Sequence, residues 1–204
     1  MLSKTLSSKA QDTRLKLIEV GTQMITENGF NNTGISEVLK AVGVPKGSFY
    51  HYFESKDDFG IQIINHFCDE YFKALDQDLN NESLSPLNRL MKNIDCSFQE
   101  FGENDYRCGC LFGNLGQEMA SQSEIFRARL EEAFNAWLQR IEALFELAKA
   151  TGEIDETIDC KELAEFYVNA IEGTIIRCKV LKSDMPIKVF NKMFYRHICS
   201  IKSA

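Results

Sequence analysis

The stretch GISEVLKAVGVPKGSFYHYF, residues 34–53, predicts two short helices joined by a glycine turn. In its first half four apolar residues recur at i, i+3, i+4 and i+7, which is the spacing of one helix face. Gly43 is a good helix stop, and Pro45 suits the first turn of the next helix, where its missing N–H is no loss. The stretch therefore predicts a helix-turn-helix with helices at 34–42 and 45–52.

The rest of the chain also has the pattern of helices. Proline occurs only three times in 204 residues, and no segment alternates apolar and polar residues convincingly at the strand period. We expect an all-α fold of about nine helices. Besides the two above, they are placed at 11–28, 55–79, 86–102, 110–121, 123–150, 159–182 and 186–202.

Composition limits the class of protein. Apolar residues make up 44% of the chain, which is ample for a core, and no run approaches the ~18 apolar residues of a membrane span. The first residues lack the apolar stretch of a secretory signal, so we expect a cytoplasmic protein without membrane partners. Seven cysteines, an odd number in a long chain, favour reduced thiols over a disulfide framework.

Charge is unevenly distributed along the chain. Residues 1–60 hold seven basic and seven acidic residues, so the formal net charge of −7 falls on residues 61–204. Local charge decides where a polyanion can bind. The N-terminal segment is therefore the part of the chain that suits nucleic acid.

A helix-turn-helix binds DNA by fitting its second helix into the major groove, with the N-terminal residues at the base edges. Here these residues include a lysine, a glycine that permits close approach and a serine that can donate to backbone or base. The candidate DNA contacts are Thr33, Pro45, Lys46, Gly47, Ser48, Tyr50, His51 and Lys56. Because many helix pairs with a glycine turn never meet DNA, the spacing alone leaves a structural role open.

Residues 29–59, GFNNTGISEVLKAVGVPKGSFYHYFESKDDF, resemble the TetR family of bacterial one-component transcriptional regulators. The resemblance implies a homodimer that binds operator double-stranded DNA with its first three helices and holds a small inducer in its C-terminal helices. It implies a DNA-binding domain at 1–56, a regulatory and dimerisation domain at 57–204, and most often a repressor. It also places all of the candidate residues at positions of DNA contact, except that many members have serine or threonine where Pro45 stands.

Two apolar stripes near the C-terminus are candidates for the dimer interface or for the monomer core. We expect them to form a four-helix interface, since the resemblance implies a dimer. The stripes are Leu163, Phe166, Tyr167, Ala170, Ile171, Thr174 and Ile175 in one helix, and Ile187, Phe190, Phe194, Ile198 and Ile201 in the next.

The segment DYRCGCLFGNLGQEMA, residues 105–120, carries two candidate sensor thiols, Cys108 and Cys110. A helix start and the adjacent Arg107 would lower the pKa of a thiol. The run resembles the Gly-Cys-Leu segment in an electrophile-sensing branch of the family, which implies that Cys110 carries a response. A buried, inert cysteine is the alternative.

The same thiols allow two other hypotheses. A lone Cys-x-Cys is a poor metal site, and no metal or other cofactor is expected. A cytosolic thiol-dependent enzyme with a merely structural helix-turn-helix is the alternative function. It would need a base, and neither His66 nor His197 has a motif that connects it to a thiol.

Overall fold

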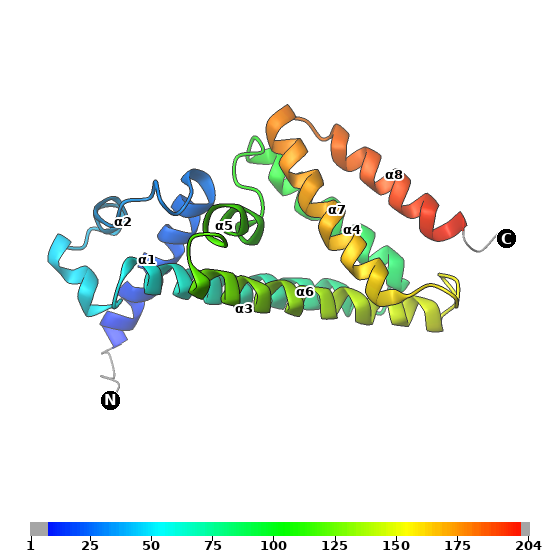
Figure 1. Ribbon diagram of the computed structural model, residues 1–204, viewed down its shortest axis with the longest axis horizontal. Helices are drawn as coiled ribbons and strands as arrows, with labels where there is room; N and C mark the ends of the chain where they lie inside the picture. Colours follow the sequence, from blue (N-terminus) through cyan, green and yellow to red (C-terminus); the bar gives the residue numbers. More distant parts are fainter. Residues whose placement is uncertain (1–7, 201–204) are drawn as a thin grey trace.

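The computed structural model describes the backbone of residues 8–200 and the side chains of residues 8–196. Across that range the chain forms nine helical segments and no strand, which confirms the all-α prediction (Figure 1). They are α1 (Ser8–Asn28), α2 (Ile35–Val42), the 3-10 helix η1 (Lys46–His51), α3 (Lys56–Leu79), α4 (Pro86–Glu103), α5 (Leu111–Met119), α6 (Glu124–Ala150), α7 (Cys160–Leu181) and α8 (Met185–Ser200). None of these described helices has the length and hydropathy of a membrane span.

The glycine turn of the helix-turn-helix has the geometry that its sequence requires. Gly43 adopts a left-handed φ of 74°, which suits a residue without a side chain. Its N–H donates to the carbonyl of Lys40 at 3.2 Å, while Val44 N–H donates to Leu39 at 2.9 Å. This pair of bonds is a Schellman motif, so the end of α2 is closed by its own backbone.

The second helix of the motif differs from the prediction. Residues 46–51 form a 3-10 helix rather than an α-helix at 45–52, and Pro45 is its N-cap. Bonds from Ser48 N–H to the Pro45 carbonyl and from Tyr52 N–H to the Phe49 carbonyl, both 2.9 Å, close the tighter turns. At six residues this segment is longer than most 3-10 helices, which serve mainly as short connectors.

An aromatic cluster fixes the helix-turn-helix to α3. The side chains of Phe49 and Phe53 are each only 2% exposed, and their ring centroids lie 5.6 and 4.7 Å from that of Phe59 on α3. α1 lies so close to α3 that a Cβ on Gly21 would be 2.3 Å from the Phe59 ring. The N-terminal helices and the first turns of α3 therefore share one core.

Two long helices form the axis of the molecule. α3 and α6 run side by side, and Gly60 lets them approach, because a Cβ there would lie 2.5 Å from the ring of Phe126 (Figure 1). α4 and α5 contact both long helices, α7 packs on α6, and α8 packs on the outer side of α7. The N-terminal helices occupy one end of this body, far from α8.

The two apolar stripes near the C-terminus serve mainly as core, contrary to the interface prediction. In the first stripe Leu163, Tyr167, Ile171 and Thr174 are buried within the chain, and in the second so are Ile187, Phe190 and Phe194. Their aromatic members join α7 to α8, with the Tyr167 and Phe194 centroids 5.5 Å apart. The side chains of Ile198 and Ile201 lie outside the described residues. Only a structure could reveal that one chain already covers these faces.

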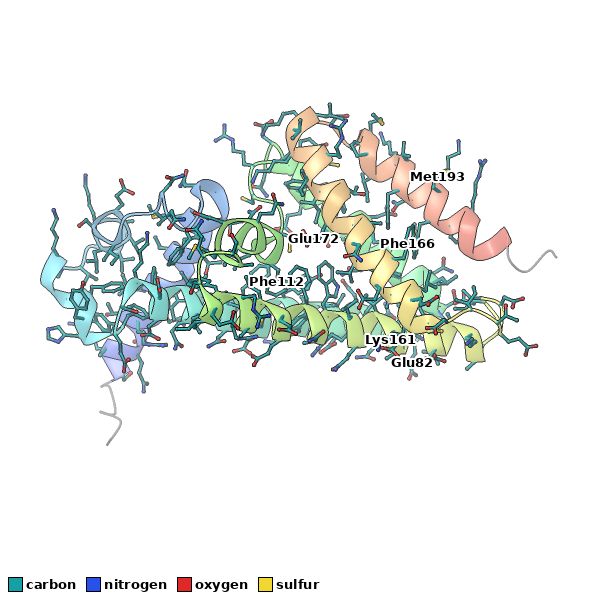
Figure 2. All side chains as sticks on the ribbon, viewed as in Figure 1. Glu82, Phe112, Lys161, Phe166, Glu172 and Met193 are labelled. Atoms are coloured by element: carbon teal, nitrogen blue, oxygen red, sulfur yellow. The ribbon has the colours of Figure 1, made fainter. Side chains whose placement is uncertain are left out.

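A second set of apolar residues on the same two helices is exposed, and it includes Phe166 from the first predicted stripe. On α7 it comprises Phe166, Ile176 and Val180, and on α8 it comprises Met185, Val189 and Met193, each 42–67% exposed (Figure 2). The α8 members recur every four residues and so share one helix face. We call these six residues the outer stripe.

Candidate functional site

The helix-turn-helix presents a continuous polar surface around η1. Pro45, Lys46, Gly47 and His51 are exposed, Ser48 is half-buried, and Tyr50 is 73% exposed. We call these six residues the reading surface. The structure brings them together because Phe49 points inward and holds η1 against the core.

Thr33 is not available to DNA in this structure. Its side chain is 2% exposed, and its hydroxyl donates to the carbonyl of Gly29 at 2.7 Å. It does not cap α2 either, since the N-cap is Gly34, whose N–H donates to Glu37 Oε2 at 3.3 Å. The short loop between α1 and α2 folds inward, so that the hydroxyl closes the end of α1 instead.

The start of α3 is also less open to phosphate than expected. Lys56 Nζ donates to the carbonyl of Asn31 at 3.3 Å and lies 4.7 Å from the Phe30 ring centroid. One of the free N–H groups there already has a partner, because Ser55 Oγ accepts from Asp58 N–H at 3.0 Å. Two acidic residues in the first turn add negative charge that disfavours an anion.

Helix α5 connects the C-terminal helices to α1 and to the loop between α1 and α2. Glu118 accepts hydrogen bonds from two backbone N–H groups of the α1–α2 loop, those of Phe30 and Asn31, both at 2.7 Å. Asn114 donates to the carbonyl of Thr26 on α1 at 3.2 Å and to that of Cys108 at 3.1 Å. Sequence reasoning missed this connection, because no local pattern marks residues that meet across almost ninety positions.

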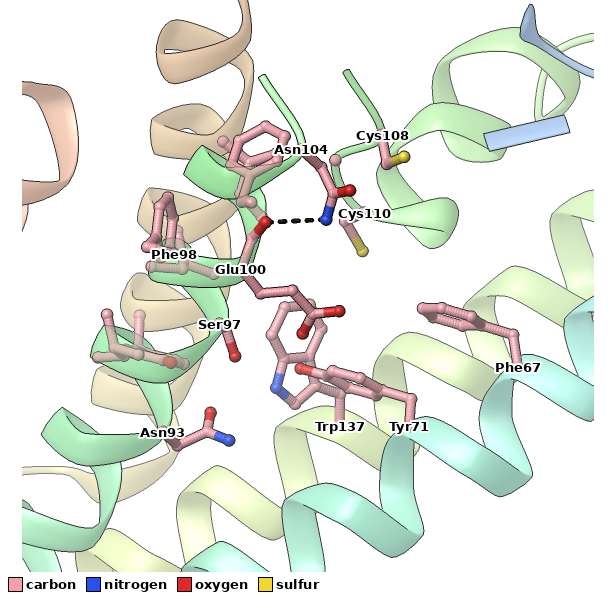
Figure 3. A pocket seen from close by; sticks show the side chains of 16 residues that line it. Phe67, Tyr71, Asn93, Ser97, Phe98, Glu100, Asn104, Cys108, Cys110 and Trp137 are labelled. Carbon is pink, nitrogen blue, oxygen red and sulfur yellow. Dashed lines mark hydrogen bonds between the residues drawn. The ribbon is translucent and has the colours of Figure 1, made fainter. Parts of the chain in front are cut away.

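A cavity of about 330 Å³ lies in the body, within the size range of small-molecule sites. Its walls come from α3, α4, α6, α7 and the loop before α5, and are rich in aromatic rings such as those of Tyr71, Phe98 and Trp137 (Figure 3). Cys108 and Cys110 both line it. We call it the regulatory cavity.

The environment of Cys110 contradicts the expectation of a lowered thiol pKa. Burial raises the pKa of this thiol well above its usual value, and the charge of Glu172 adds to the effect. The thiol donates a hydrogen bond to that carboxylate. Helix-start N–H groups favour the thiolate, as expected, but their contribution is smaller. Arg107 does not lower the pKa of the Cys110 thiol, because its side chain is 73% exposed and pairs with Asp105 at 3.6 Å.

Glu172 is itself an unusual group. Burial raises the pKa of this carboxyl, and its Oε1 atom has no hydrogen-bond partner among the described residues. It lies against Gly113, where a Cβ would be 2.1 Å from Oε2 and would force the carboxyl to move. Burial also raises the pKa of the Cys108 thiol.

Across residues 8–196 no group of three or more histidine, cysteine, aspartate or glutamate side chains could hold a metal ion. The six cysteines within that range form no disulfide bond with one another.

Comparison with known families matches both parts of the chain. Residues 17–61 match the model of bacterial regulatory proteins of the tetR family, and residues 86–194 match that of the tetracyclin repressor-like C-terminal domain. The transcriptional regulator AcuR of Cereibacter sphaeroides is 40% identical over 89% of this chain and 83% of its own. The transcriptional repressor NemR of Escherichia coli K12 is 33% identical over 59% of this chain and 61% of its own.

Solved structures agree with these sequence relatives. The regulatory protein TetR from Rhodobacter sphaeroides superposes with a TM-score of 0.86 at 39% identity, covering 91% of this chain and 98% of that one. The reduced form of E. coli NemR superposes with a TM-score of 0.80 at 25% identity, covering 93% and 97%. The helix-turn-helix, the helical body and these similarities lead to one conclusion: the chain belongs to the TetR family and is a DNA-binding transcriptional regulator.

Proposed function

We propose that this protein is a repressor that leaves its operator when a small molecule occupies the regulatory cavity. The observation that carries the proposal is that helix α5 connects the cavity to the N-terminal helices. Asn114 of α5 donates to the carbonyl of Cys108 in the cavity loop, and Glu118 of α5 accepts from Phe30 N–H in the α1–α2 loop. A ligand that favours one position of that helix would shift the population between DNA-competent and DNA-incompetent arrangements.

Helix α5 supplies the physical route for this coupling. One end of α5 starts at the cavity, where Cys110 is its N-cap, and the other end carries Glu118 with its two bonds to the α1–α2 loop. Asn114 between them bonds to both parts. A displacement of the cavity loop would therefore move the reading surface, in addition to any tilt of α3.

The proposed DNA contacts are the members of the reading surface, Pro45, Lys46, Gly47, Ser48, Tyr50 and His51. Their exposure supports the proposal, as does the lack of net charge over residues 1–60. Thr33 and Lys56 then act by shaping the α1–α2 loop. We place the DNA-binding domain at 1–56 and the regulatory domain at 57–204, and we expect the protein to work in the cytoplasm, where DNA is found.

A homodimer is the proposed active form, held by the outer stripe. Six large apolar side chains exposed on two adjacent helices are more than scattered surface residues, and a twofold axis would bury them against their copies. Two reading surfaces would then meet successive major grooves about 34–36 Å apart.

Operator selection followed by an inducer screen tests the proposal. Protein is incubated with random DNA duplexes to select a palindromic site, and compounds are then screened for release of that site by fluorescence anisotropy. Ser97→Trp, which places bulk at the cavity wall, should bind the operator normally but need a higher inducer concentration for release. The control is Gln139→Trp, at an exposed position of α6 that does not line the cavity.

Two outcomes would argue against the proposal. If Ser97→Trp is released at the wild-type inducer concentration, the inducer binds elsewhere. If no DNA sequence is enriched and the protein instead turns over a thiol-reactive compound, the enzyme hypothesis is the better one. We expect no turnover, since the partner of Cys110 is a buried carboxyl rather than an imidazole.

A further inference from the structure

The regulatory cavity contains a hydrogen-bond donor that the chain leaves unused. Trp137 on α6 lines the cavity and is 4% exposed, and its Nε1–H has no hydrogen-bond partner among the described residues. Buried N–H groups are nearly always paired, because an unpaired one loses its bond to water without replacement. A ligand atom that accepts a hydrogen bond would satisfy this indole, and a ligand ammonium group would not.

The charges of the lining residues indicate whether the ligand's hydrogen-bond acceptor is charged or neutral. None of the described residues that line it is lysine, arginine or histidine, whereas Glu100 lines it and turns its carboxylate toward it (Figure 3). A second carboxyl, Glu172, lies directly behind the Cys110 thiol. An anionic ligand would therefore meet the Glu100 carboxylate with no cationic side chain among the lining residues to balance its charge, because Lys179 outside the lining already donates to the Cys108 carbonyl at 3.2 Å. The acceptor atom should therefore be uncharged.

The walls indicate the shape of the rest of the ligand. Tyr71 stacks nearly parallel to Phe67, with centroids 5.6 Å apart and an interplanar angle of 5°, and meets Trp137 edge to face at 5.6 Å. Aliphatic side chains of α4 and α7 extend this apolar surface, and polar side chains such as those of Asn93 and Ser97 lie on the α4 side. Flat aromatic walls favour a planar, apolar body, which gains contact area and offset or edge-on ring packing.

We propose that the regulatory cavity binds an uncharged ligand with a planar apolar body and an oxygen acceptor, such as a ketone, that takes a hydrogen bond from Trp137 Nε1–H. This inference rests on the proposed function, in which the cavity is the inducer site. It goes further by naming the ligand class and the side chain that selects it.

Four compounds of similar size and different polarity test the ligand class on the wild-type protein: acetophenone, ethylbenzene, benzoate and benzylammonium. Binding is measured by calorimetry and by the fluorescence of Trp137, which is the chain's single tryptophan and so reports on the cavity alone. Acetophenone should bind most tightly, ethylbenzene about three- to tenfold more weakly, and the two ions most weakly. Tightest binding of benzoate or benzylammonium would overturn the proposal, as would the failure of all four to bind.

Trp137→Phe tests the hydrogen bond itself, since it keeps an aromatic ring and removes the N–H. Calorimetry should show a loss of about three- to tenfold for acetophenone and less than about twofold for ethylbenzene. Equal losses for both would overturn the role of the indole. Should this variant not fold, the wild-type series still decides the ligand class. The operator-release screen is independent of these compounds, so the proposed function can stand if the ligand class is wrong.

Discussion

The reading surface and the regulatory cavity use polar groups in opposite ways. The reading surface comes from one continuous stretch and exposes most of its polar groups, with Tyr50 73% exposed. The cavity is built by four helices and a loop, and groups with incomplete hydrogen bonding lie in or beside it: Trp137 lines it, and Glu172 lies behind the lining residue Cys110. Substitutions in the first region should change DNA binding with little change in stability. Those in the second should change stability, chemical reactivity or the response to ligand.

The largest effect is expected at the outer stripe, which holds the two subunits together in the proposed homodimer. Placing charges in the outer stripe with Val180→Glu and Met193→Glu would bury carboxylates against their copies at a twofold axis. The protein should become monomeric, and operator affinity should fall at least 100-fold, because the second half-site is no longer bound intramolecularly. Sedimentation and operator titration measure both effects.

Two further variants separate loss of the dimer from loss of the fold. Leu147→Glu, at a comparably exposed residue of α6 outside the outer stripe, should leave the dimer intact. Ile171→Glu, which is 4% exposed within one chain, should unfold the protein rather than dissociate it. An intact dimer for the outer-stripe variant would place the interface elsewhere.

Slow alkylation of the Cys110 thiol is expected, in contrast to faster alkylation of an exposed cysteine. Since burial and Glu172 raise the pKa of this thiol, less of it is thiolate at pH 7 than in an ordinary cysteine. Iodoacetamide should label it about tenfold or more slowly than the exposed Cys96, and its labelling should accelerate as the pH rises toward 9. Mass spectrometry of the peptides gives both rates. Equal labelling at pH 7 would restore direct thiol sensing as the better hypothesis.

Lys46→Ala tests the reading surface by itself. The exposed ammonium neutralises a phosphate in the proposed complex, so its loss should weaken operator binding about tenfold in moderate salt. The plot of log K against log salt should flatten by about one unit for each lost contact. The melting temperature should not change, and Lys161→Ala, exposed at the start of α7, is the control. An unchanged salt slope would remove Lys46 from the interface.

Glu172→Gln tests how a buried carboxyl affects the pH dependence of folding stability. The carboxyl has a raised pKa in the folded protein, so the folded state holds its proton at pH values where the unfolded chain, near 4.5, has lost it. The wild type should lose stability as the pH rises from about 4.5 through the raised pKa, while the glutamine variant lacks this loss. Urea denaturation of both proteins between pH 4 and pH 8 gives the difference, and a constant difference would contradict the raised pKa.

The smallest effect is expected at Thr33, which the sequence analysis placed among the candidate DNA contacts. Thr33→Ala removes the bond to the Gly29 carbonyl and should cost about 1 kcal/mol of stability. The salt dependence of DNA binding should not change, and Thr33→Ser, which keeps the hydroxyl, should recover most of the loss. A flattened salt slope in the alanine variant would return Thr33 to the DNA contacts.

The accuracy of the sequence-based predictions follows the range of the interactions involved. The helix boundaries were placed closely because caps and turn residues act within a few positions: Ser55 accepts from Asp58, and Gly43 closes α2. Apolar periodicity also identified α7 and α8 correctly. It could not tell which of their apolar faces was already covered, so most of the predicted interface residues, Ile171 and Phe194 among them, proved to be core, whereas Phe166 is exposed.

The sequence by itself determined the helical class, the helix-turn-helix and the position of most of the reading surface, because each depends on neighbours a few residues apart. Tertiary structure decided the rest: the grip of Glu118 on the α1–α2 loop, the environment of Cys110 and the unpaired N–H of Trp137. Burial and electrostatic environment arise only when distant helices meet. The same cysteine at a helix start has a lowered pKa beside a cation in water and a raised one when it is buried beside a carboxylate.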